Sequence, residues 1–179
     1  MGVAAWSIAQ SAPTLDTYWT VGAGAISTQK WLGSADIRRG GHYFVTYNRP
    51  EPRFAFQNRP GTMSLMGYYT VHKGGGFFGQ PFNALHAWGV LMTARYWNRD
   101  NRALPTFYEV GWGLHFGNRW IEDIDTPIAS TPTLGAGVLV QFGEQEGIFA
   151  VRWMHVSNAG TGFRNRGQNG LIFTFELKF

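Results

Sequence analysis

Apolar and polar residues alternate with a period of two along most of this 179-residue chain. Near its end, residues 171–179 read LIFTFELKF, in which every odd position is apolar and most even positions are polar. Successive side chains of a β-strand point to opposite faces, so the pattern predicts a strand with one apolar face. We find eight such segments, near residues 17–27, 41–49, 63–73, 85–97, 105–117, 133–142, 147–157 and 169–179.

The length and character of these segments favour strands that cross a membrane. Most have about 9 to 13 residues, which suits a tilted strand spanning a bilayer. Their apolar faces carry Trp, Tyr and Phe, and their opposite faces combine glycine with occasional charge. We therefore predict an all-β fold, an eight-stranded antiparallel transmembrane β-barrel with a lipid-facing aromatic exterior. The charged residues predicted to form an internal network are Arg95, Glu109, Arg152, Glu176 and Lys178.

A soluble, lipocalin-like barrel is the alternative, and it would place the apolar faces inside. Loop lengths agree with the membrane barrel, because outer connections are expected to be long and periplasmic turns short. The long connections, predicted to be external, are 28–40, 74–84, 118–132 and 158–168, and the short ones are 98–104 and 143–146. The connection 50–62 is long for a periplasmic turn, and its RFAFQ stretch is interpreted as extending a strand.

The N-terminal residues and the composition bear on the domain boundaries, the partners and the cofactors. Two interpretations of residues 1–12 stay open, a signal remnant and an N-terminal extension, with the barrel domain at 13–179. The net charge is +4, but the arginines are scattered, so we expect no nucleic-acid partner. Cysteine is absent, and the histidines lack metal-ligand spacing, so we predict neither a metal site nor a cofactor.

One polar pair interrupts an apolar strand face, in the stretch WMHVSNAG at residues 153–160. Within 147–157, His155 and Ser157 share the odd face with Trp153, whereas Arg152 belongs to the opposite face. Positions i and i+2 lie roughly 7 Å apart along a strand, so a twist or bulge would bring imidazole and hydroxyl into hydrogen-bond reach. The alternative is that both are interfacial polar residues at the edge of the apolar band.

The residues that follow this pair carry a family resemblance. HVSNAG and the later NRGQN resemble the active-site segment of the PagL-type lipid A 3-O-deacylases, or acyloxyacyl hydrolases, which are eight-stranded outer-membrane barrels. The residues that match this motif are His155, Ser157, Asn158, Ala159, Asn165 and Gly167. PTFYEVGWG at 105–113 and LGAGVLVQF at 134–142 are similar more weakly, and the first 80 residues match only in barrel pattern.

The resemblance implies serine-ester hydrolysis of lipid A. Ser157 would be the nucleophile and His155 the general base, then the general acid. From their proximity to Ser157, and not from the resemblance, we expect Asn158, Gly160 and Asn165 to be oxyanion or positioning residues. The family's third residue is a glutamate, and an ungapped alignment puts Asn169 there, which is able to orient an imidazole but carries no charge. For Asn169, a plain turn residue is the alternative.

Arg164 and Arg166 lie on the same outer loop and are suited to binding the phosphates of lipid A; solvated loop charge is the alternative. The first hypothesis is thus a bacterial outer-membrane esterase acting on lipid A, or lipopolysaccharide. The second is an inactive barrel of the same family that acts as a structural or partner-binding subunit, and the third is a soluble lipid-binding barrel. The expected partners are lipid A, outer-membrane lipids, and a homodimer or larger envelope complex.

Overall fold

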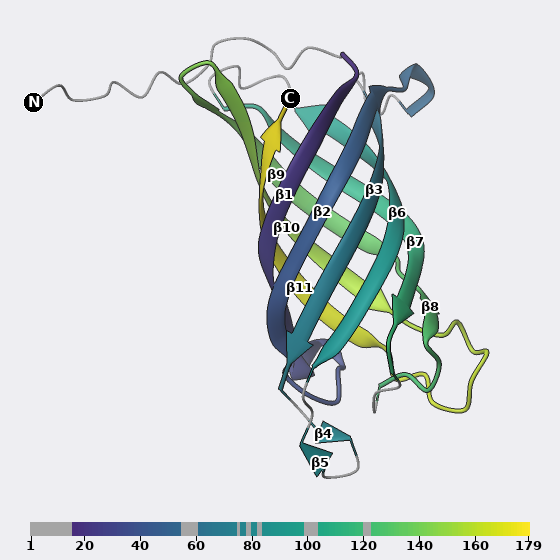
Figure 1. Cartoon of the computed structure of the whole chain (residues 1–179). Coiled ribbons are helices and arrows are strands. Elements are labelled where there is room, and N and C mark those ends of the chain that lie inside the picture. The colour runs from purple at the N-terminus through teal and green to yellow at the C-terminus, as the bar shows by residue number, and fades with distance from the viewer. Residues whose placement is uncertain are drawn as a thin grey trace, which may run out of the picture.

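Eight long strands close into one antiparallel barrel in the computed structural model, which describes residues 16–54, 61–74, 76–77, 80–81, 84–98, 104–119 and 123–179 (Figure 1). The long strands are β1 (Tyr18–Thr28), β2 (Arg39–Pro50), β3 (Gly61–Lys73), β6 (Leu85–Asn98), β7 (Thr106–Gly117), β9 (Thr133–Phe142), β10 (Gln145–Val156) and β11 (Gln168–Lys178). Each pairs with its neighbours along the chain, and the pairing of β1 with β11 closes the barrel. All eight predicted segments are therefore confirmed as strands.

Shorter elements occupy the connections. They are β4 (Gly76–Phe77), β5 (Gln80–Pro81), β8 (Ile128–Ser130) and the 3₁₀ turns η1 (Lys30–Leu32) and η2 (Pro52–Phe54). The two helices of the described residues are these single turns, and neither is long or apolar enough to span a membrane. Arg53 and Phe54 lie in η2, so the expectation that RFAFQ extends a strand is wrong for them; residues 55–60 and 1–15 lie outside the described residues.

The apolar faces of the strands point outward, as the membrane barrel predicts and the soluble alternative does not. Trp19, Trp112 and Phe173, on three different strands, are each about half exposed. The inward faces are buried, and glycine there makes room for large rings: a Cβ atom at position 22 would lie 2.2 Å from Cζ of Phe44. Small residues on one strand thus admit aromatic side chains from the next, which fills the narrow interior.

A buried ion-pair network crosses the interior, and it contains four of the five predicted residues. Glu109 accepts from Nε of Arg95 at 2.9 Å and from Nε of Arg152 at 2.5 Å. Arg152 also donates to Glu176 at 2.6 Å. Lys178 is not a member, because it pairs with Glu146 at the barrel rim. Alternation places position 178 inward, but it is the last residue of β11, where the side chain reaches the partly exposed rim.

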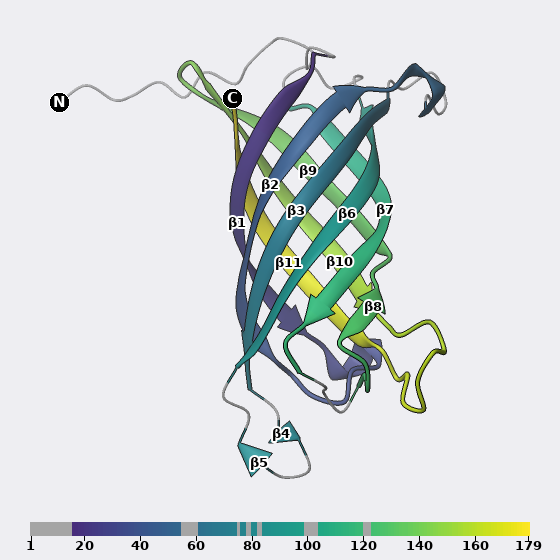
Figure 2. The same ribbon diagram turned by 45° about the vertical axis from the view of Figure 1, so that its right-hand side comes forward.

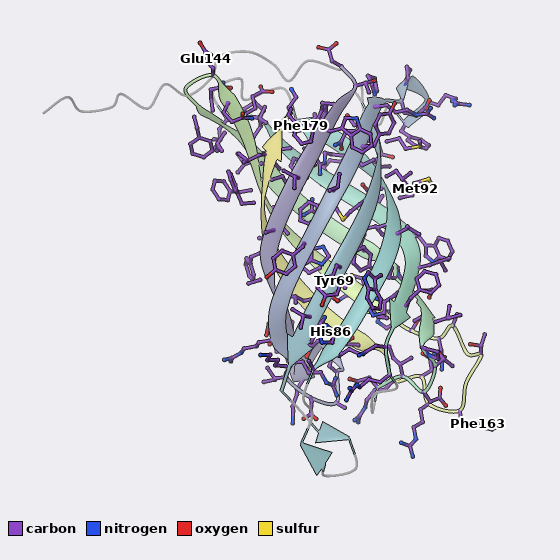
Figure 3. All side chains as sticks on the ribbon, in the orientation of Figure 1. Tyr69, His86, Met92, Glu144, Phe163 and Phe179 are labelled. Carbon is purple, nitrogen blue, oxygen red and sulfur yellow. The ribbon has the colours of Figure 1, made fainter. Side chains whose placement is uncertain are left out.

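The two ends of the barrel differ in their connections, as Figure 2 shows from a second side. The start of β1, the C-terminus and the tight turn between β9 and β10 lie at one end, and the hairpin β4–β5, η1 and β8 lie at the other. In Figure 3, Glu144 marks the first end and Phe163 the second. Long connections gathered at one end agree with the predicted outer loops.

Candidate active site

The candidate site forms where β10 ends at the outer rim. The sequence predicted that the strand runs through Ser157, but β10 stops at Val156. Ser157 instead forms an isolated antiparallel bridge with Ser130, the last residue of β8. The Ser157 amide donates to the Ser130 carbonyl at 3.0 Å, and the Ser130 amide donates to the Ser157 carbonyl at 2.7 Å. A short strand from a distant loop therefore fixes the backbone of the candidate nucleophile.

His155 and Asn169 meet across the pairing of β10 with β11. They are directly opposed in the antiparallel register, so their side chains emerge on one face. Nδ1 of His155 lies 2.9 Å from Oδ1 of Asn169. The imidazole also stacks on Trp153, with ring centroids 5.9 Å apart. These contacts confirm that His155 lies on the same outward face as Trp153, and they place Asn169 beside its ring.

The hydroxyl of Ser157 contacts Ser130 and not His155. Oγ of Ser157 lies 3.4 Å from Oγ of Ser130. The Ser130 hydroxyl also donates to the Ser157 carbonyl at 3.2 Å. A hydrogen bond between His155 and Ser157 is not among those that the described residues make. Ser157 is only 8% exposed, because β8 covers the end of its strand.

The turn after Ser157 is held by side-chain hydrogen bonds. The amide of Asn158 donates to Oδ1 of Asn165 at 3.1 Å, and the amide of Gly160 donates to Oδ1 of Asn158 at 3.0 Å. Ala159, between them, has a φ of 53°, in the left-handed region that non-glycine residues rarely adopt. The three predicted positioning residues are therefore linked by hydrogen bonds within the loop next to the serine.

Asp125 anchors the last outer loop from a different connection. Its carboxylate accepts from Nδ2 of Asn158 and from the amide of Arg164, each at 2.9 Å. These hydrogen bonds lower the pKa of Asp125 below its usual range, and the one from the Arg164 amide has the largest effect. Arg164 and Arg166 are both exposed on this loop, and the fully exposed Phe163 marks its tip (Figure 3).

Gly167 brings the returning chain against the imidazole. Its φ is 80°, and a Cβ atom at this position would lie 2.3 Å from Cε1 of His155. Position 167 therefore requires glycine for two reasons, the backbone conformation and the closeness of the ring.

The first outer loop supports Asn169 from the other side. The Asn169 amide donates to Oγ of Ser34 at 2.7 Å, and the Ser34 hydroxyl donates to the Asn169 carbonyl at 3.1 Å. Ser34, Ser130 and Asp125 were missed at the level of the sequence. Each stands in a connection between two long strands, where the sequence has no periodic pattern, so no local signal marked it.

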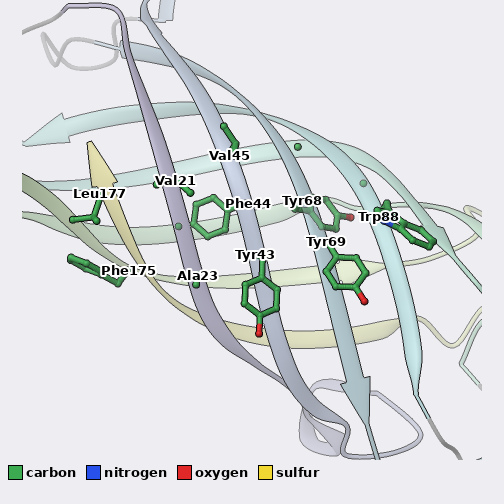
Figure 4. A pocket seen from close by; sticks show the side chains of 13 residues that line it. Val21, Ala23, Tyr43, Phe44, Val45, Tyr68, Tyr69, Trp88, Phe175 and Leu177 are labelled. Atoms are coloured by element: carbon green, nitrogen blue, oxygen red, sulfur yellow. The ribbon is translucent and has the colours of Figure 1, made fainter. Parts of the chain in front are cut away.

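The lipid-facing wall also has an apolar groove away from the serine. It runs across β11, β1, β2, β3 and β6, and Figure 4 shows Tyr43, Tyr69 and Trp88 along it. Tyr69 extends its hydroxyl to Nδ1 of His86, 2.5 Å away, on the outer wall (Figure 3). No group of three or more possible metal ligands occurs in the part of the chain that the structure describes.

Comparison with known proteins identifies a family and a similar fold. The model of the lipid A 3-O-deacylase (PagL) family matches residues 4–178. A crystal structure of the outer membrane enzyme PagL is similar with a TM-score of 0.64 and 18% sequence identity, covering 88% of this chain and 97% of that chain. No curated protein matches the sequence significantly. At that identity the structural likeness shows the fold, whereas the family match extends over almost the whole chain.

Proposed function

This chain belongs to the PagL family of lipid A 3-O-deacylases, and we propose from this premise that Ser157 and His155 hydrolyse an ester-linked acyl chain of lipid A. The family is one of outer-membrane ester hydrolases, and the barrel has the matching fold. The observation that carries the proposal is the contact of His155 Nδ1 with Asn169 Oδ1 on the outward wall. A lipid in the outer leaflet reaches that wall by lateral diffusion.

The contact with Asn169 sets the tautomer of the neutral imidazole. A carboxamide oxygen only accepts, so in the neutral ring Nδ1 of His155 carries the hydrogen and Nε2 keeps its lone pair. A neutral imidazole with a basic Nε2 is the form that takes a proton from a serine. Asn169 therefore supports the general-base role of His155 through orientation, without supplying charge.

The reaction we propose has two halves. Ser157 turns its hydroxyl from Ser130 toward His155, and its Oγ bonds to the acyl carbonyl carbon while the proton passes to Nε2 of His155. The ester bond to the sugar oxygen then breaks, and that oxygen takes the proton. Water attacks the acyl-serine, its proton again passing to His155, and the carboxylic acid leaves as Ser157 recovers its hydrogen.

The turn after the serine supplies the surroundings of the reacting carbonyl. The amides of Asn158 and Gly160 are hydrogen-bonded within the turn. In our proposal Asn158, Gly160 and Asn165 therefore shape the turn, and the N–H of Ala159 donates to the oxyanion. The left-handed φ of Ala159 supports this assignment, since strained backbone is maintained where a peptide group must point in one direction.

Arg164 and Arg166 are proposed to bind the phosphates of lipid A. Both are exposed on the loop that Asp125 anchors beside the serine. Guanidinium groups bind phosphate oxygens in a bidentate manner, so this loop would orient the sugar headgroup over the wall. A homodimer or larger envelope complex stays a prediction.

The deciding experiment is mass spectrometry of lipid A from cells expressing the wild type or Ser157→Ala. We expect lipid A to lose one acyl chain with the wild type and to stay intact with the variant. Heat-modifiable migration in gels establishes that both barrels are folded in the membrane. Equal acylation in the two samples would contradict the enzymatic proposal and favour an inactive barrel that binds a partner.

A further inference from the structure

Asp123 joins the first and last outer loops at one buried point. Its Oδ2 lies 2.6 Å from Nη1 of Arg38, and neither side chain has any exposed surface. Its Oδ1 accepts from the amide of Ala35 in the first outer loop. Its carbonyl accepts from the amide of Gly167 in the last outer loop at 3.2 Å. One residue thus holds two loops that are far apart in sequence.

Both of these loops contact the candidate catalytic pair. Ala35 follows Ser34, whose hydroxyl exchanges two hydrogen bonds with the backbone of Asn169. Gly167 lies so close to His155 that even a methyl group would collide with the ring. Asp123 is therefore connected to Asn169 through the first outer loop and to His155 through the last outer loop.

We propose that the Asp123–Arg38 ion pair is a positioning device that holds His155 against Asn169. Neither residue touches the reacting atoms, so both are positioning residues. The expected effect on kcat rests on the proposed function, whereas the expected effect on the position of the His155 ring does not. If the Asp123 carboxylate moves away, the buried Arg38 guanidinium loses its nearest carboxylate, at 2.6 Å, and keeps that of Asp36 at 4.0 Å, so the pair favours one arrangement of the loops. The Asp123–Arg38 pair is not needed to close the barrel, because the strands pair all the way round and the interior has its own ion-pair network.

The direct test measures the reactivity of His155 and not only catalysis. Asp123→Asn keeps the side-chain size and removes the charge. Diethyl pyrocarbonate modifies accessible imidazoles, and peptide mass spectrometry reports the rate at each histidine. We expect His155 to react about tenfold faster in the variant, and kcat to fall about hundredfold with little change in KM, because misplaced catalytic groups lose rate. His86, on the outer wall and bonded to Tyr69, should react at an unchanged rate.

A cysteine pair tests the same idea without a buried charge. The chain has no cysteine of its own. The triple variant Ala35→Cys, Arg38→Met, Asp123→Cys therefore forms one disulfide, which joins the first outer loop to the segment that contains position 123. The reduced form should show fast modification of His155 and low kcat, and oxidation should reverse both. Lys30→Ala, which removes only an exposed ion pair with Asp36 in that loop, is the matched control and should behave as wild type.

The outcomes separate the two proposals. Wild-type reactivity of His155 in Asp123→Asn, or a triple variant whose oxidised and reduced forms behave alike, would overturn the positioning role. A wild-type protein that leaves lipid A intact, while His155 still responds to Asp123→Asn, would overturn the proposed function and keep the positioning role.

Discussion

Nδ1 of His155 lies 2.9 Å from Oδ1 of Asn169, at directly opposed positions of β10 and β11. Because the two residues are cross-strand partners, the sheet itself brings the side chains together on one face. The partner is a carboxamide, whereas the resemblance implies a carboxylate at this position. The geometry of the pair is thus present, and the charge that would stabilise an imidazolium is missing.

Asn169→Asp should therefore raise activity. A carboxylate of the same length keeps the hydrogen bond and makes it charge-assisted, which is stronger than a neutral one. We expect kcat for ester hydrolysis to rise by about tenfold, or about 1.4 kcal/mol of transition-state stabilisation. Asn169→Ala is the control and should lower kcat, because the ring loses its orientation. An Asp variant no faster than wild type would show that charge at this position does not limit the reaction.

Ser130→Ala should also raise activity, though less. The Ser130 hydroxyl gives its hydrogen to the Ser157 carbonyl, so at the Oγ–Oγ contact of 3.4 Å we infer that Ser157 is the donor. Ser130 then competes with His155 for that hydrogen. A neutral hydrogen bond is worth about 0.5–1.5 kcal/mol, so its loss should raise kcat about twofold to tenfold.

The control for Ser130 is Ser130→Thr, which keeps the hydroxyl and should retain wild-type kcat. Both variants preserve the backbone bridge to Ser157, so folding is expected to be unaffected. A fall in kcat on removal of the hydroxyl would show that Ser130 assists the nucleophile instead of competing for its proton.

Gly167→Ala should abolish most activity by displacing the imidazole. The new methyl group would lie 2.3 Å from Cε1 of His155, and displacement of a catalytic group by about 1 Å costs roughly a hundredfold in rate. Gly143→Ala is the matched control. Gly143 also has a positive φ, 64°, but nothing lies within 4 Å of its added Cβ atom. That variant should lose about 1 kcal/mol of stability from backbone strain and keep its activity. Equal rates in the two variants would contradict the steric explanation.

Acid should loosen the last outer loop through Asp125. The pKa of Asp125 is lowered by hydrogen bonds that the folded loop donates, first from the Arg164 amide. The unfolded loop binds a proton more readily, so the stabilisation is fully present above the ordinary Asp pKa of about 4 and is lost as pH falls through the lowered pKa. The protection of the amides of residues 158–166 against hydrogen exchange, relative to their intrinsic rates at each pH, should therefore fall below about pH 4. Asp125→Asn should exchange faster at neutral pH and lose this pH dependence.

Much of the architecture was predictable because alternation is a local signal. The predicted strand near 85–97 appears as Leu85–Asn98, and the predicted strand 133–142 appears unchanged. The odd or even position of a residue along its strand also predicted that Trp153 and His155 point outward and that Arg152 points inward. The contacts of these residues agree. The errors lie at strand ends, at Ser157 and Lys178, where pairing stops and a side chain is no longer bound to one face.

The sequence by itself determined the barrel and the outward face of His155, which follow from period-two alternation, and a short motif that resembles a known family singled out Ser157 as the candidate nucleophile. Only the tertiary structure decided what surrounds them. Ser130 bridges to Ser157, Ser34 supports Asn169, and Asp123 with Arg38 joins the outer loops. Those partners come from aperiodic loops distant in the chain, and they meet because closure of the barrel brings one end of every strand to the same rim.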